Sequence, residues 1–283
     1  MYSRVYVEIT NICNRNCSFC PGTLRPLRRM SLAEFDTVTD RLRGVTEYVY
    51  YHVMGEPLTH PDLPDFIRMA KEKGFKSAVT TNGTLLSKRG RELVEAGIYK
   101  VNISVHSFED GEDSSAHGQY LNEILDFAEY ASKNGVLTVL RLWNLDGNGE
   151  ALGGNNPRTL DYLRARFPDT DETPWKFSSR GARVRDKLHL EYGDRFEWPD
   201  MGADDRGNSV FCYGLKDHFA VLCDGSVVPC CLDREGAVAL GNIFESPVES
   251  ILATPRATAM REGFQRRCAT EELCRKCGYA RRF

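Results

Sequence analysis

Alternating and helical hydrophobic patterns follow one another along the first two-thirds of the chain. Residues 4–9 alternate polar and apolar side chains and include β-branched residues, a pattern typical of a strand. Residues 31–42 begin with a Ser-x-x-Glu capping box and continue with helical spacing of apolar positions, which predicts an amphipathic helix. Further strands are predicted at 47–53, 76–81, 100–105, 136–143 and 187–191. Further helices are predicted at 61–73, 85–96, 120–132 and 157–167.

This repeated strand–helix order predicts the fold class. Parallel strands joined by right-handed helical crossovers form a sheet that helices cover. Five or six repeats are too few for an eight-unit barrel, so we predict an α/β fold, a partial (β/α)6 barrel with parallel strands. In such folds the reacting groups lie at the C-terminal ends of the strands.

The pattern changes in the last third of the chain. Residues 168–208 are polar and weakly periodic, which predicts long loops or a linker. Beyond them, 219–222 and 226–228 flank Asp224-Gly225, a strong β-hairpin signal. We therefore predict a partial barrel followed by a small C-terminal domain built from a hairpin and helices. The predicted domains are residues 1–200 and residues 201–283.

Composition narrows the class of protein. Hydrophobic residues make up 41% and charged residues 27%, and the net charge is -3, which gives no general attraction to nucleic acid. The chain has no apolar run long enough to span a membrane, and it begins with a strand-like segment rather than a signal peptide. We therefore expect a cytoplasmic protein that needs neither a membrane nor nucleic acid as a partner.

The chain has ten cysteines, and these indicate metal sites, because a reducing cytoplasm disfavours disulfides. Three lie near the start and seven lie in the last quarter, and none lies between these groups. Two metal centres on two modules are the simplest explanation. The cysteines are Cys13, Cys17, Cys20, Cys212, Cys223, Cys230, Cys231, Cys268, Cys274 and Cys277.

The first group places three thiols within eight residues, directly after the first strand: Cys13, Cys17 and Cys20. A single zinc ion would need a fourth ligand from a distant part of the chain. An iron–sulfur cube held by three cysteines instead leaves one iron open for a ligand that binds and reacts. The spacing alone leaves both interpretations open.

The second group places Cys212 and Cys230 seventeen residues apart around the hairpin, and adds a Cys274-x2-Cys277 knuckle. Four thiolates from the base of a hairpin and a knuckle can close around one metal centre. This spacing is compatible with zinc and with iron–sulfur alike.

The Cys-x3-Cys-x2-Cys spacing, with Phe19 before its last cysteine, resembles the radical S-adenosylmethionine (SAM) family. A Gly-Glu-Pro motif at the end of the second strand and a Thr-Asn-Gly motif at the end of the third occur in the order that this family has. The resemblance implies a SAM-binding 4Fe–4S cluster on the three early cysteines. Phe19 could contact the adenine or simply pack. The residues that the resemblance assigns to SAM are Phe19, Gly55, Glu56, Pro57, Thr81, Asn82, Ser104 and Arg141.

The resemblance also implies the chemistry. SAM would chelate the open iron, and one electron from the cluster would cleave it to methionine and a 5'-deoxyadenosyl radical. This radical would abstract a hydrogen atom from the substrate. An electron donor such as flavodoxin or ferredoxin would be a partner of such an enzyme.

The C-terminal segment from Cys223 to Cys231, with a following Leu-Gly-Asn-Ile-Phe, resembles the SPASM and Twitch extensions of this family. Because the last cysteines lack the full SPASM set, the shorter Twitch type is the better match, similar to radical SAM dehydrogenases that act on 2-deoxy-scyllo-inosamine. This resemblance implies one auxiliary 4Fe–4S cluster. Its implied ligands are Cys212, Cys230, Cys274 and Cys277.

A cluster held by four cysteines would accept electrons rather than bind substrate, which suits dehydrogenation of an alcohol. Epimerisation would instead need a hydrogen-atom donor, and Cys231 is the candidate catalytic residue. Carboxylates in the loops after the later strands would suit a cationic aminosugar or aminocyclitol. The loop residues considered are His106, Glu109, Asp110, Trp143, Asn144 and Asp146.

Other functions remain open. A maturase of a ribosomally made peptide is one, although we expect no peptide-recognition module before the first strand. A lyase or epimerase acting on a nucleoside-type metabolite is another. A non-catalytic zinc or iron–sulfur protein would not need the Gly-Glu-Pro and Thr-Asn-Gly motifs. The sequence does not identify the substrate.

Overall fold

The computed structural model describes residues 1–108, 114–145 and 155–282. Two compact units are present, and the chain passes between them more than once. Unit 1 comprises Met1–Asn14, Cys20–Ser77 and Phe196–Phe283. Unit 2 comprises Arg15–Phe19 and Ala78–Arg195.

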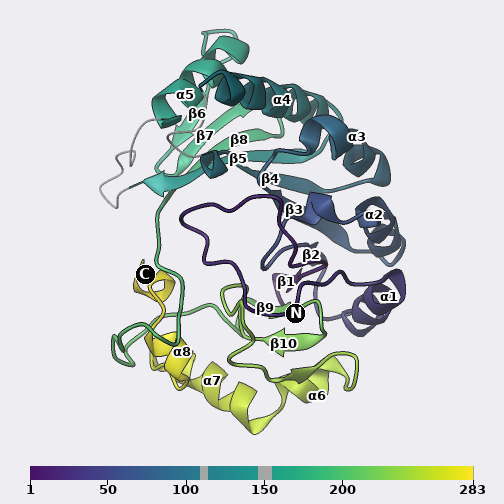
Figure 1. Cartoon of the computed structure of the whole chain (residues 1–283), viewed down its shortest axis with the longest axis vertical. Helices are drawn as coiled ribbons and strands as arrows, with labels where there is room; N and C mark the ends of the chain where they lie inside the picture. The colour runs from purple at the N-terminus through teal and green to yellow at the C-terminus, as the bar shows by residue number, and fades with distance from the viewer. Residues whose placement is uncertain (109–113, 146–154, 283) are drawn as a thin grey trace. The chain divides into compact units, whose positions relative to one another are not determined.

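Unit 1 contains a sheet in the order β11-β10-β9-β1-β2 (Figure 1). Strand β1 is parallel to both of its neighbours, β2 and β9, whereas β10 is antiparallel to β9 and β11. The strands are β1 (Arg4–Val7), β2 (Tyr48–Tyr50), β9 (His218–Val221), β10 (Ser226–Val228) and β11 (Gly241–Asn242). The helices are α1 (Leu32–Arg41), η1 (Pro57–Thr59), α2 (Leu63–Glu72), α6 (Val248–Leu252), α7 (Pro255–Gln265), α8 (Glu272–Arg275) and η3 (Tyr279–Arg282).

Alternation along β1 separates a core face from a polar face. Val5 and Val7 are fully buried, while Arg4 and Tyr6 point to the opposite face and remain half-buried. Helix α1 begins at the predicted capping box, and its Phe35 stacks on a phenylalanine of α2 with ring centroids 4.5 Å apart. The aliphatic face of the strand is therefore the one that is fully enclosed, and the polar face remains available for a site.

Unit 2 contains a sheet in the order β3-β4-β5-β8-β7-β6, of which β3 starts in unit 1. The first four strands are parallel, and β7 is antiparallel to both neighbours. The strands are β3 (Lys76–Thr81), β4 (Lys100–Ser104), β5 (Leu137–Leu145), β6 (Lys176–Ser178), β7 (Gly181–Arg185) and β8 (Leu188–Asp194). The helices are α3 (Leu86–Ala96), η2 (Val105–Ser107), α4 (Ser114–Lys133) and α5 (Asn155–Arg166).

The predicted α/β class with a mostly parallel, unclosed sheet and a small C-terminal domain is confirmed: no strand among the described residues pairs with the outer side of β6 or β11. The prediction of long loops or a linker over 168–208 is wrong for β6 and β7, which lie there, whereas the strand predicted at 187–191 is confirmed as part of β8. All three residues of β6 are exposed, so this strand has no buried face and leaves no alternating pattern. The domain boundary between residues 200 and 201 stays a prediction.

The predicted hairpin is confirmed as β9 and β10. The sequence did not predict that β9 also pairs with β1, which makes the C-terminal hairpin part of the same sheet as the first strand. Among the described helices, none combines the length and apolar character that crossing a membrane requires.

Candidate active site

The loop between β1 and α1 carries the first three cysteines. In unit 1, Cys13 is exposed and Cys20 is partly buried. In unit 2, the Sγ of Cys17 lies 3.7 Å from the carbonyl oxygen of Ser107. Thiols are the donors that an iron–sulfur cluster requires, so the residue types fit the implied group. Their grouping around one cluster stays a prediction.

The Gly-Glu-Pro loop packs directly against the residues that lead into Cys13. Gly55 has a φ of +78°, and a Cβ there would lie 2.5 Å from the carbonyl oxygen of Thr10. The next amide, that of Glu56, donates to the carbonyl oxygen of Ile12 at 2.9 Å. Only glycine allows this approach, so the loop that is expected to bind the SAM amino group is fixed to the cysteine loop.

The carboxylate of Glu56 is buried and accepts a hydrogen bond from the amide of Leu58 at 3.0 Å. It thereby caps η1, in which Pro57 is the first residue. This cap fixes the direction of the carboxylate. The assignment of Gly55, Glu56 and Pro57 to SAM stays a prediction.

In unit 2, the ends of the parallel strands bring the next predicted residues together. Ser104 is the register partner of Arg141 across β4 and β5. The Arg141 guanidinium lies 3.7 Å from a carboxylate oxygen of Glu191 and 4.5 Å from the centroid of the Trp143 ring. The side chain of Arg141 is therefore held at the C-terminal edge of the sheet, where α/β folds place their sites.

Thr81 and Asn82 shape the turn at the end of β3. The hydroxyl of Thr81 accepts from the amide of Gly83, and the side-chain oxygen of Asn82 accepts from the amide of Thr84, both at 3.0 Å. The backbone oxygen of Asn82 accepts from the hydroxyl of Tyr120 at 2.7 Å. These contacts make the turn rigid, whatever it binds.

Phe19, like Cys17, lies on the part of the cysteine loop that belongs to unit 2. Its ring lies 5.3 Å from that of His106, centroid to centroid, and His106 Nδ1 lies 3.0 Å from the carbonyl oxygen of Arg141. Packing on His106 is thus observed, and an adenine contact stays a prediction. The carboxylates of Glu109, Asp110 and Asp146 lie outside the described residues.

The four predicted ligands of the auxiliary cluster all lie in unit 1. Burial, together with the neighbouring Cys277, raises the pKa of the Cys212 thiol to about 11, although the hydrogen bond from the amide of Gly214 acts to lower it. Burial raises the pKa of Cys230 well above its usual value, with added effects of Cys212, Cys274 and Cys277 among others. Such mutual effects indicate that these thiols lie in the same region of unit 1.

A set of four thiols is the donor chemistry that iron–sulfur clusters prefer. In the described part of the chain, no three His, Cys, Asp or Glu side chains come close enough together to form a site for a single metal ion. The assignment of Cys212, Cys230, Cys274 and Cys277 as cluster ligands stays a prediction. Cys268 instead forms an isolated backbone bridge with Ser209.

A buried carboxylate that the sequence analysis missed joins three segments of unit 1. Both oxygens of Glu8 accept from the guanidinium of Arg25, at 2.8 and 2.6 Å. Glu8 also accepts from the amides of Met54 and Cys223, each at 3.1 Å. Cys223 is fully buried, as a small apolar residue would be. A charged residue at a polar-face position of an alternating strand was the signal in the sequence.

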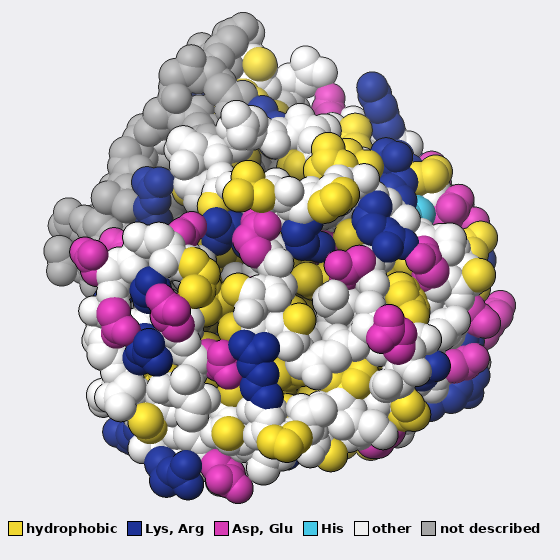
Figure 2. Space-filling view, turned by 60° about the horizontal axis from the view of Figure 1, so that its bottom comes forward, with side chains coloured by type: hydrophobic (Ala, Val, Ile, Leu, Met, Phe, Trp, Pro, Cys, Tyr) yellow, Lys and Arg dark blue, Asp and Glu magenta, His cyan; other side chains and the backbone are white. Residues whose placement is uncertain are grey.

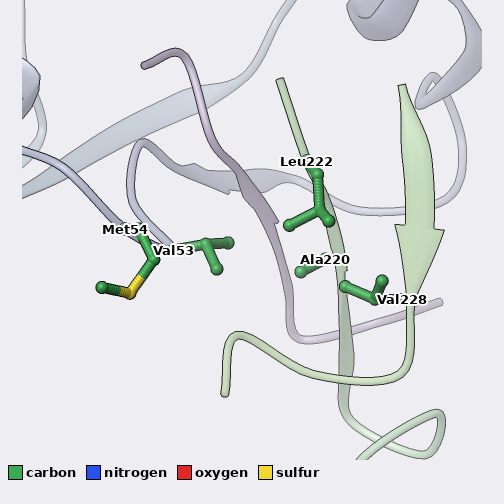
Figure 3. Close-up of a cluster of buried hydrophobic side chains, with 5 residues drawn as sticks. All are labelled: Val53, Met54, Ala220, Leu222 and Val228. Carbon is green, nitrogen blue, oxygen red and sulfur yellow. The ribbon is translucent and has the colours of Figure 1, made fainter. Parts of the chain in front are cut away.

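A small hydrophobic cluster, which we call the Val53 cluster, consists of Val53, Met54, Ala220, Leu222 and Val228 (Figure 3). Four partly buried residues pack against it: Tyr6, Cys20, Trp198 and Cys231. Two thiols from the two separate cysteine groups, Cys20 and Cys231, therefore contact one apolar surface.

Comparison with known families agrees with this arrangement. Residues 7–151, just over half of the chain, match the radical SAM superfamily. Residues 212–278 match the SPASM iron–sulfur cluster-binding domain.

Several individual proteins resemble this chain over only part of their sequence. A GTP 3',8-cyclase of Aliarcobacter butzleri is 31% identical over 154 residues, 51% of this chain and 47% of that protein. For that protein and two further relatives named GTP 3',8-cyclase or probable GTP 3',8-cyclase, the match covers only 33–47% of their length.

Two solved structures are similar in fold. The crystal structure of BtrN in complex with AdoMet and 2-DOIA has a TM-score of 0.62 at 21% identity and covers 98% of this chain and 93% of its own. Streptococcus suis SuiB bound to the precursor peptide SuiA has a TM-score of 0.61 at 14% identity, with coverages of 98% and 70%.

The family match lies on the segment that carries the three early cysteines and the Gly-Glu-Pro loop, and the domain match spans the four cysteines that are predicted to hold the auxiliary cluster. The chain therefore belongs to the radical SAM superfamily and carries a SPASM-type iron–sulfur cluster-binding domain.

Proposed function

We propose that this protein removes a hydrogen atom from a carbinol C–H bond of a small molecule and completes either a dehydrogenation or an epimerisation. The family implies SAM with a 4Fe–4S cluster, and the SPASM domain implies auxiliary iron–sulfur clusters. When bound, these groups supply a hydrogen-abstracting 5'-deoxyadenosyl radical and an acceptor for one electron.

The chain's own residues have distinct roles in this proposal. Glu56 lies beside the cysteine loop, where it can orient the SAM amino group. Ser104 and Arg141 lie together at the ends of β4 and β5, where they can orient the ribose and the carboxylate. The SAM cluster would be held by Cys13, Cys17 and Cys20, and the auxiliary cluster by Cys212, Cys230, Cys274 and Cys277.

The observation that carries the proposal is the contact of Cys20 and Cys231 with the same Val53 cluster. Cys20 is an expected ligand of the SAM cluster, and Cys231 follows Cys230, an expected ligand of the auxiliary cluster. A substrate on this apolar surface would be near both sites, and the surface would keep water away from a carbon radical.

The fate of that radical decides between the two reactions. If the Sγ–H of Cys231 donates its hydrogen atom to the opposite face of the carbon, the product is an epimer, and the thiyl radical left on Cys231 returns to the thiol by taking one electron from the protein's electron donor and one proton from water. If the radical instead loses one electron and its hydroxyl loses a proton, the product is a ketone. Solvent deuterium at the product carbon identifies the first outcome, because a thiol exchanges its hydrogen with water.

The test uses the full chain, reconstituted with iron and sulfide without oxygen, reduced and incubated with SAM. We expect 5'-deoxyadenosine and about eight irons per chain. Cys20→Ala should remove 5'-deoxyadenosine formation. Cys231→Ala should retain it and lose only the epimer, if an epimer is the product. A protein that holds its iron but never cleaves SAM would contradict the proposal.

A nucleotide is the second candidate substrate, because the curated relatives include GTP 3',8-cyclases. If it is the substrate, GTP should accelerate 5'-deoxyadenosine formation and be consumed with it in equal amounts. An unchanged rate and unchanged GTP would exclude this candidate.

A further inference from the structure

The polar face of the unit 1 sheet carries five large side chains, which we call the Arg4 face: Arg4, Tyr6, Tyr50, His52 and His218. Strand register brings them together, since Arg4 is the partner of His218 and Tyr6 is the partner of Tyr50. The Tyr6 ring lies 5.1 Å from that of His52 and 5.5 Å from that of His218. Each of these residues is partly buried and keeps part of its surface exposed.

Arg4 contributes a charge that the described protein does not neutralise. Its guanidinium carbon lies 5.8 Å from the centroid of the Tyr50 ring, and within the described residues no carboxylate pairs with it. Its Nε is buried and has no hydrogen-bond partner among those residues. Burial acts to lower the pKa of Arg4, but Tyr6, Tyr50 and Cys231 raise it, so that the net pKa is raised and the group stays charged.

His218 adds a neutral hydrogen-bonding group beside this cation. Burial and the charge of Arg4 lower the pKa of His218 to about 4, so the ring is neutral near pH 7. Its Nδ1 is buried and, in the described part of the protein, has no hydrogen-bond partner. A neutral imidazole has one N–H to donate. The face thus offers one fixed positive charge and one unused ring nitrogen.

A partly buried cation without a counter-ion lowers stability, and proteins keep such a group where a ligand completes it. We propose that the Arg4 face binds the anionic group, a carboxylate or a phosphate, of the enzyme's small-molecule substrate. The Arg4 guanidinium is the counter-ion, because its planar fork of N–H donors matches both anions. His218 donates the additional hydrogen bond.

This inference rests on the proposed function. Tyr6 connects the two, because it belongs to the Arg4 face and also packs against the Val53 cluster. An anionic group held by Arg4 leaves the remainder of the substrate directed along this cluster, where Cys20 and Cys231 lie. The positive charge of Arg4 favours an anionic substrate. The carboxylates of Glu109, Asp110 and Asp146, which are outside the described residues, led the sequence analysis to expect a cationic one.

The experiment measures binding rather than turnover. The reconstituted, SAM-saturated full chain is titrated calorimetrically with glucose 6-phosphate, gluconate and glucose, so that phosphate, carboxylate and neutral probes share one carbon skeleton. We expect at least one anion to bind and glucose not to bind, and the tighter anion identifies the class. Arg4→Gln should weaken that binding at least about tenfold, which is about 1.4 kcal/mol. Arg68→Gln, which removes an exposed arginine of α2, should leave it unchanged.

Thermal unfolding separates a binding role from a structural one. Arg4→Met removes an unneutralised charge, so we expect it to raise the melting temperature without ligand and to abolish the increase that the anion gives wild type. The inference is overturned if wild type binds neither anion more tightly than glucose, or if Arg4→Gln binds as wild type does. 5'-Deoxyadenosine formation by the same preparation keeps the two proposals apart: if it persists without anion binding, only this inference fails.

Discussion

At the scale of single residues, Glu8 is a buried charge that joins three segments of unit 1. It is fully buried, and the partner side chain of Arg25 is 12% exposed. Glu8→Gln removes the negative charge and leaves the buried guanidinium without its counter-ion. We expect the free energy of unfolding to fall by about 3 kcal/mol, because breaking one side of a buried ion pair has effects of this size. Urea unfolding of the reduced, cluster-free chain measures it.

The double variant Glu8→Gln/Arg25→Met is the matched control for this prediction. It removes both charges and restores packing with an apolar side chain, so most of the lost stability should return. If the double variant is as unstable as Glu8→Gln, the ion pair is not the cause, and the amide contacts of Met54 and Cys223 hold the loops instead.

His218 makes stability depend on pH in a defined direction. Its folded pKa of about 4 lies below the usual value of 6.5, so the unfolded chain takes up a proton first as the pH falls. The stabilisation that results from this pKa difference is complete above pH 6.5. As the pH falls towards 4, the free energy of unfolding loses at most about 3 kcal/mol from this source. His218→Gln cannot titrate. Its unfolding free energy should therefore fall less than that of wild type between pH 7 and pH 4.5, and parallel curves would contradict this prediction.

The cysteines and the SAM motifs could be found from the sequence because their chemistry is local. Cys-x3-Cys-x2-Cys and Gly-Glu-Pro each lie within a few residues. Arg4 and Glu8 could not be assigned in this way, because their roles depend on what three strands and two loops bring to them. The alternation of β1 marks both as polar-face residues, but it does not show that Glu8 has a cationic partner or that Arg4 has no anionic partner among the described residues.

At the scale of elements, the Gly-Glu-Pro loop depends on one glycine. Gly55→Ala places a Cβ 2.5 Å from the backbone oxygen of Thr10 and keeps a φ of +78°. Gly74 is the control, because its φ is +88° and a Cβ there meets no atom within 4 Å. We expect Gly74→Ala to cost about 1 kcal/mol, the strain of a left-handed alanine alone, and Gly55→Ala clearly more. Melting temperatures compare the two variants.

SAM binding gives a second test of the same element. If the loop is displaced from Thr10, Gly55→Ala should also bind SAM more weakly by calorimetry, whereas Gly74→Ala should bind it as wild type does. Equal melting temperatures for the two variants would show that the loop can move away from β1 without loss.

Most elements with a buried face were predicted, although β7, in which Ala182 and Val184 are buried, was missed. Helix α1 was found because its capping box, Ser31 with Glu34, precedes a regular apolar face. Strand β6 was missed because it lies at the edge of its sheet with every residue exposed, including Phe177 at 67%. Hydrophobic periodicity reports burial, so a strand that packs against nothing leaves no signal.

At the scale of the whole molecule, the one face that Figure 2 shows carries charge that is spread rather than gathered. The space-filling view shows basic and acidic side chains interspersed over the visible face, in keeping with a net charge of -3 (Figure 2). Recognition of a charged substrate would therefore depend on a single placed group such as Arg4, and not on a general surface potential.

The first and last parts of the chain belong to one folded unit, and this gives the last prediction. Strand β1 pairs with β9 through four residues, and Phe219, Ala220 and Val221 of β9 are fully buried. A chain ending at residue 200 lacks β9, so β1 would be an exposed edge with uncovered apolar neighbours, which favours aggregation. We expect fragment 1–200 to be insoluble alone and soluble when co-expressed with fragment 201–283. Truncation after residue 278, which keeps β9 and the four auxiliary cysteines, should remain soluble. If fragment 1–200 is monomeric by size-exclusion chromatography and unfolds cooperatively, β9 is dispensable, and the C-terminal segment is an appended module rather than part of the sheet that carries the site.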